Sequence, residues 1–154
     1  MANEDTRYPT RLPVWWGRHG SPGPHPLERG VSGKLVTLRI EKKFNRLESL
    51  IRKVLRGPRE LKRPLDDLNS VIWELADGTR SVEEIVGLMD ITFHEKVAPA
   101  KHRTEAALLQ MQQLRIIAML KEPFGKKWHI GPGIIPDGQT LDDIDLNSYS
   151  FEEE

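Results

Sequence analysis

The amino-acid sequence predicts an α+β domain in which three core helices pack against a small antiparallel sheet. The first observation behind this prediction is a pair of short helical patterns that meet at a sharp corner between residues 65 and 90. The second is a set of alternating, β-prone segments before and after the helices. The third is a length of 154 residues, which suits one domain with tails. Together they predict a winged helix-turn-helix-like fold with one extra N-terminal amphipathic helix.

The corner carries the strongest local signals. Asp66 is placed to cap the first turn of one helix, and Gly78 follows the last apolar residue, where glycine closes a helix at little steric cost. Ser81 and Glu84 have the spacing of a capping box, so a second helix starts at once. The apolar stripes of the two helices are Leu65, Leu68, Val71, Ile72 and Leu75, then Val82, Ile85, Val86 and Met89.

We expect residues 1–33 to form an extended, basic arm, because five prolines and five glycines preclude a regular helix there. Two tryptophans lie inside this arm, and leaving their indoles in water would forgo a large hydrophobic contribution. Either they fold back on the domain or they dock on a partner, and the sequence leaves both open. The residues of the candidate docking arm are Arg11, Trp15, Trp16 and Arg18.

Three elements are expected between the arm and the corner. Residues 34–40 alternate in the manner of a strand, and residues 42–56 form a basic amphipathic pattern that ends at Gly57 and Pro58. Core packing explains that stripe better than contact with acidic membranes or phosphates. Residues 59–64 are short and polar and end at a proline, which cannot donate a ladder hydrogen bond, so an edge strand is predicted.

A third helix and a wing are expected after the corner. The helix has its apolar period at Thr104, Ala107, Leu108, Met111 and Leu114. Residues 115–120 and 127–130 are β-prone and are separated by a turn-like segment, so they predict a two-stranded wing. The predicted domain therefore spans residues 34–131, and an irregular acidic tail spans residues 132–154.

The net charge of zero hides a gradient along the chain. Residues 1–63 hold 15 Lys and Arg against 6 Asp and Glu, a balance of +9. Residues 64–136 hold 8 against 10, and residues 137–154 hold none against 7, so the balances are −2 and −7. Such polarity indicates an electrostatic partner for one end, a contact between the two ends, or simply solvated termini.

The chain offers little for catalysis. It has no cysteine, which excludes disulfides and thiol chemistry, and no two of its five histidines have the i, i+4 spacing of a helical metal site. The acidic pairs at 66–67 and 83–84 belong in the first turns of helices, where they complement the macrodipole. We therefore expect no enzyme, no metal and no cofactor. Without a signal peptide or an apolar run long enough for a membrane span, a cytoplasmic protein is expected.

A set of motifs extends across the helices: Leu65-Asp66, Val71 to Leu75, the Asp77-Gly78 turn, Arg80 to Val86, Phe93 and the pattern from Leu108 to Ile117. With these motifs, the chain from about residue 34 to residue 120 resembles the PqqD family, which carries the peptide-recognition element of ribosomally made, modified peptide pathways. The resemblance implies a small winged-helix-like unit. Such a unit binds a leader peptide as an added strand beside the last strand before the helices, with the third helix as the other wall.

The resemblance also implies a peptide-binding site. Its strand would be Glu60, Leu61, Lys62 and Arg63, and its helical wall would be His102, Glu105, Leu109, Gln112 and Gln113. An edge strand offers unpaired backbone groups that an extended peptide satisfies, and Lys62 with Arg63 would suit an acidic peptide. The alternative is that these residues form an ordinary solvated edge and helix face.

A second function class stays open, because the arms and the predicted extra helix depart from the simplest family pattern. The protein would then be an accessory subunit of a larger protein or ribonucleoprotein assembly, anchored by its terminal arms. Base-specific DNA binding is disfavoured because the segment from Ser81 to Asp90 has no Lys or Arg. Nucleic-acid contact would run only through the basic N-terminal arm.

Overall fold

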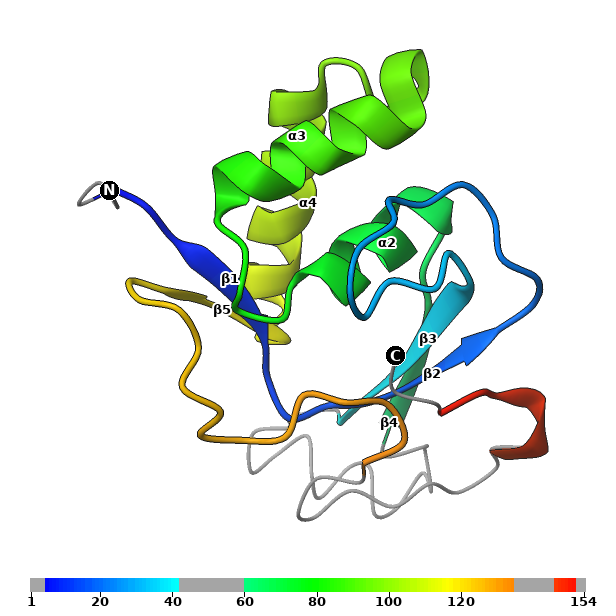
Figure 1. Ribbon diagram of the computed structural model, residues 1–154. Helices are drawn as coiled ribbons and strands as arrows, with labels where there is room; N and C mark the ends of the chain where they lie inside the picture. Colours follow the sequence, from blue (N-terminus) through cyan, green and yellow to red (C-terminus); the bar gives the residue numbers. More distant parts are fainter. Residues whose placement is uncertain (1–4, 42–59, 135–145, 152–154) are drawn as a thin grey trace, which may run out of the picture.

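A computed structural model describes residues 5–41, 60–134 and 146–151 (Figure 1). The described chain is mixed α+β, with antiparallel sheets and three α-helices. Its strands are β1 (Tyr8–Arg11), β2 (Trp15–His19), β3 (Leu35–Glu41), β4 (Glu60–Pro64) and β5 (Ile117–Leu120). Its helices are α2 (Asp67–Leu75), α3 (Val82–Phe93) and α4 (Ala100–Gln113), with short 3₁₀ turns at His94–Val97 and Leu146–Ser148. The predicted amphipathic helix over residues 42–56 lies outside the described residues.

The strands form two separate antiparallel sheets. One has the order β2-β3-β4, so β3 lies in the middle and the predicted edge strand, β4, lies at one margin. The other pairs β1 with β5, from Tyr8 opposite Leu120 to Arg11 opposite Ile117. Figure 1 shows α2 over the three-stranded sheet, with α3 and α4 on the far side of α2.

The predicted wing differs from the observed one. Residues 117–120 form a strand, but its partner is β1 from the N-terminal segment, and residues 127–130 form no strand. Hydrogen bonds with residues of β1 and β2 hold the later segment instead. Trp128 Nε1 donates to the Arg11 carbonyl at 2.7 Å, and Trp16 Nε1 donates to the Ile130 carbonyl at 3.0 Å.

The helix ends follow the predicted caps. The Asp66 carboxylate accepts a hydrogen bond from the Asn69 amide at 2.8 Å, and Ser81 and Glu84 form a reciprocal capping box. Gly78 lies in the turn between α2 and α3 with φ of +83°, in the left-handed region that favours glycine. These local interactions satisfy amide groups that the first turns leave without intrahelical partners.

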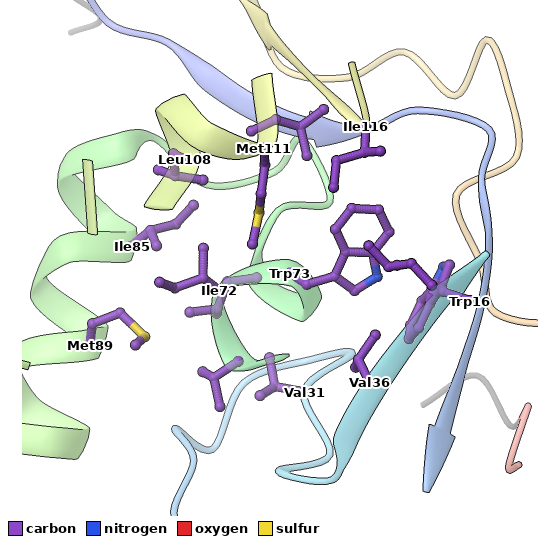
Figure 2. Close-up of a cluster of buried hydrophobic side chains, with 14 of the residues drawn as sticks. Trp16, Val31, Val36, Ile72, Trp73, Ile85, Met89, Leu108, Met111 and Ile116 are labelled. Atoms are coloured by element: carbon purple, nitrogen blue, oxygen red, sulfur yellow. The ribbon is translucent and has the colours of Figure 1, made fainter. Parts of the chain in front are cut away.

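The hydrophobic core brings together side chains from every layer (Figure 2). Trp16 of β2 meets Trp73 of α2 edge to face, with ring centroids 6.0 Å apart. The core continues through Ile72 towards Ile85 of α3 and Leu108 of α4, all of them buried.

The segment predicted as an extended arm thus contributes to the fold. Residues 8–19 supply two strands and their connection, and both Trp15 and Trp16 are buried. Of the two alternatives for the tryptophans, the structure adopts the one in which they fold back. Burying two indoles provides a hydrophobic gain that an extended arm would not have.

The Gly78 turn generates a stability prediction. A Cβ at Gly78 would meet the Phe124 side chain and would lie 2.7 Å from Thr10 Oγ1, in addition to the cost of the positive φ. We expect Gly78→Ala to lower the free energy of unfolding by at least about 1–2 kcal/mol, measured by urea denaturation.

Gly87→Ala is the matched control. Gly87 lies within α3 and a Cβ there has no neighbour within 4 Å, so this change should stabilise the protein by about 0.5–1 kcal/mol. Equal effects of the two substitutions would contradict the predicted role of the turn.

Candidate functional site

The outer margin of β4, on the side away from β3, is the first part of the candidate site. In the described part of the chain, β4 pairs with β3 on one side and with no strand on the other. The Leu65 amide donates to the Val36 carbonyl at 2.8 Å, which fixes the alternation of the ladder. In an antiparallel pair, alternate residues direct their backbone groups inwards. Arg63 and Leu61 therefore face β3, whereas Lys62 and Pro64 present their backbone groups to the open margin.

A groove between α2 and α4 is the second part. It has a volume of about 560 Å³ and begins two residues after the end of β4, at Asp66. Its lining is more apolar than polar. The lining residues include Leu68 and Ile72 of α2, Val97 and Pro99 before α4, and His102, Arg103, Ala106, Ala107 and Gln110 of α4.

The predicted strand residues and wall residues fare differently. Glu60, Leu61, Lys62 and Arg63 lie together in β4, with Lys62 exposed and Arg63 half-buried. His102 lines the groove. The other predicted wall residues are exposed on α4 but do not line the groove, and they are Glu105, Leu109, Gln112 and Gln113.

The groove is lined by a different face of α4 from the one that the sequence predicts. Thr104, Leu108 and Met111 are the buried positions of this helix, and the groove is lined on the side of Arg103, Ala106 and Gln110. The adjacent alanines at 106 and 107 were the available signal, because small side chains on one helix face leave room for a ligand or a neighbour. Their direction depends on where α2 packs, and the period of α4 alone does not give it.

An ion pair lies beside the groove. The ammonium of Lys96, in the 3₁₀ turn before α4, donates to the carboxylate of Asp67 in the first turn of α2. The hydrogen bond from Lys96 lowers the pKa of the Asp67 carboxyl below its ordinary value, against a smaller opposing effect of burial. The pair joins the two segments whose neighbours, Asp66 and Val97, line the groove.

The four residues of the candidate docking arm are enclosed in the protein. Arg11 donates through Nη1 to the Trp73 and Glu74 carbonyls at 2.8 and 2.9 Å. Arg18 Nε donates to the Glu74 carboxylate at 2.7 Å, and both guanidinium groups lie over the Trp16 ring. Trp15 and Trp16 are each 1 % exposed. In this structure these four side chains are buried and contact the rest of the domain, so they are not exposed for docking on a partner.

Burial shifts the pKa of one of these charged groups. Desolvation lowers the pKa of Arg11 to about 10, with Asp77 opposing the shift and the nearby Arg18 adding to it. The guanidinium group keeps its charge at neutral pH, so it retains its hydrogen bonds at the end of α2.

Among the residues in the described ranges, no group of three or more His, Cys, Asp or Glu side chains gathers where a metal ion could bind. The same residues contain no helix of the length and apolarity needed to cross a membrane. No protein-family model, no curated protein and no solved structure matches the chain.

The Asp67 pair generates a prediction on pH dependence. The lowered pKa means that the pair stabilises the fold above the ordinary carboxyl pKa and that this contribution disappears as the pH falls through the folded-state pKa. Asp67→Asn should therefore have a lower melting temperature than the wild type at pH 7, and the difference should shrink as the pH falls below the ordinary carboxyl pKa.

Lys96→Met tests whether the partner is responsible. If the pair causes the effect, Asp67→Asn should change the melting temperature much less in the Lys96→Met background. Additive losses at pH 7 would assign the effect of Asp67 to the helix dipole and to the hydrogen bond that its carboxylate accepts from the Leu68 amide.

Proposed function

We propose that this chain is a non-catalytic peptide-binding module of the winged-helix, PqqD-like type, which holds an extended peptide by strand addition along β4. The observation that carries the proposal is the margin of β4, which has no partner strand in the described residues. Two residues after β4 ends, the chain reaches the groove between α2 and α4 at Asp66. Unpaired N–H and C=O groups at strand spacing are what an added strand satisfies.

The order of elements supports the same proposal. A three-stranded sheet ends in β4, and three helices follow it along the chain, with α4 forming the far wall of the groove. This is the order in which the PqqD-like unit would present its last strand and third helix. The pairing of β5 with β1 is a departure from a simple hairpin wing, and it lies in the other sheet, away from the proposed margin.

Charge and shape indicate the kind of peptide. Lys62 is exposed on β4, Arg63 is half-buried beside it, and Arg103 and His102 are exposed at the groove. The apolar lining of the groove would receive an apolar side chain of the peptide. The proposed ligand is therefore an extended segment that combines an apolar anchor with acidic residues, which the nearby cations attract.

The test of strand addition uses peptides selected on the full chain from a random library of 12-residue peptides displayed on phage. Lys62→Pro removes an amide that faces the open margin while leaving the inward amides of β4 in place. Losing a main-chain hydrogen bond of about 1 kcal/mol and introducing the ring of proline should weaken binding about tenfold or more, measured by calorimetry.

Lys62→Ala is the control, since it removes the same side chain but keeps the amide. An exposed charge contributes little, so the affinity should fall less than about fivefold. Selected peptides that bind Lys62→Pro and Lys62→Ala equally well, or a library that yields no binder, would overturn the proposal.

A second prediction concerns charge. Arg63→Glu should weaken the selected acidic peptides about tenfold at low salt, with Arg63→Gln in between, because a half-buried charge is screened less than an exposed one. The gap between the two variants should shrink in 0.5 M salt. Binding that does not depend on the charge at this position would remove the acidic character from the proposed ligand.

A further inference from the structure

The margin of β2 is the second margin of the three-stranded sheet, and the chain's own C-terminal segment lies on it. Arg18 and Ser150 form an antiparallel bridge. The Ser150 amide donates to the Arg18 carbonyl at 2.7 Å, and the Arg18 amide donates to the Ser150 carbonyl at 3.2 Å. We call residues 149–151 the C-terminal strap. Its backbone pairs with β2 as an added strand would.

Aromatic side chains attach the strap to the face of β2. Trp15 is buried, and Tyr149 and Phe151 meet its ring edge to face at centroid distances of 5.3 and 5.8 Å. His19 meets Tyr149 at 5.8 Å, also edge to face. Such pairs contribute about 0.5–1.5 kcal/mol each beyond the area that they bury. The alternate residue, Ser150, supplies the backbone hydrogen bonds between the two rings.

Two glycines leave room for these rings. A Cβ at Gly17, in the middle of β2, would lie 3.0 Å from atoms of both Tyr149 and Phe151. A Cβ at Gly133 would lie 2.7 Å from the Phe151 ring, and the Gly133 amide donates to the Trp16 carbonyl at 2.8 Å. Aromatic rings that cover a glycine in a neighbouring strand are a known way of fixing register in a sheet. Residues of β2 and Gly133, which are distant in the sequence, thus form the surface on which the strap packs.

We propose that the margin of β2 and the Trp15 ring form a second strand-binding site, whose ligand is an extended aromatic–small–aromatic segment, and that the chain's C-terminal strap fills this site in cis. Tyr149 and Phe151 stay partly exposed, and in the described residues the Arg18–Ser150 bridge supplies the backbone pairing between the strap and β2. A free segment competes with a tethered one at an effective concentration on the order of millimolar. The site therefore accepts the same segment in trans when the strap is removed from it.

The experiment uses the full chain carrying Tyr149→Ala and Phe151→Ala, and the probe is a synthetic peptide of residues 141–154. Binding is followed by NMR through the Arg18 amide and the Trp15 indole N–H. The peptide should return both signals towards their wild-type positions and should leave the signals of the β4 amides in place. The last readout separates this site from the one proposed at β4, on which the inference does not depend.

Two controls use the same readout. The wild-type chain should show no shift at peptide concentrations that saturate the variant, because its site is already filled. A peptide carrying the same two alanines should bind at least tenfold more weakly than the native one. Equal shifts with both peptides, or no shift with either, would overturn the proposal.

Gly17→Ala provides a second test that needs no added peptide. In the wild-type chain the new methyl group meets the strap, so the Trp15 and Arg18 signals should move to the positions seen in the Tyr149→Ala, Phe151→Ala variant. Combined with those two changes, Gly17→Ala should have no further effect on the melting temperature. The same loss of melting temperature in both backgrounds would show that Gly17 matters only for β2 itself. It would contradict the proposal that Gly17 leaves room for the strap.

Discussion

A buried cluster of charges at the C-terminal end of α2 holds the N-terminal strands to the helices. The last carbonyls of a helix lack intrahelical partners. Here Arg11 donates hydrogen bonds to the Trp73 and Glu74 carbonyls, and Arg80 donates to the Leu75 carbonyl. The Glu74 carboxylate, 1 % exposed as a residue, is paired with Arg18 and accepts two further hydrogen bonds from Ser32. Removing one member of such a buried pair typically costs about 3–5 kcal/mol, because the other charge is left uncompensated. Strands β1 and β2 are therefore fixed by the helix end that they complete.

The features that the sequence predicts well are those that depend on near neighbours. Asp66 and the Ser81–Glu84 box cap helices within three residues of themselves, so their roles can be predicted without knowing the fold. The strand before residue 41 and the edge strand that ends at Pro64 follow from alternation and from the missing amide of proline. The α+β class follows from these elements.

The features that the sequence does not reveal depend on distant partners. β1 pairs with β5 across more than a hundred residues, and Tyr8 to Arg11 carry no alternation that would select this partner over the segment at 127–130. The dense proline and glycine content correctly excludes helix from the described residues 5–33, but it leaves open whether the two tryptophans meet the chain's own core. The groove-lining face of α4 is hidden for the same reason. Arg103 and Gln110 line the groove only because α2 packs beside them.

The two margins of the three-stranded sheet make the case for strand addition more specific than an open edge alone would. An unpaired edge invites association, and proteins protect such edges when they do not use them. This chain covers the β2 margin with its own strap. Two glycines leave room for the rings of the strap, and a buried tryptophan packs against them. Along β4, in the described residues, the only protective features are an exposed lysine and a terminal proline. The two margins therefore differ: in the described residues the strap covers the β2 margin, whereas no strand pairs along β4, the margin at which we propose that an incoming strand binds.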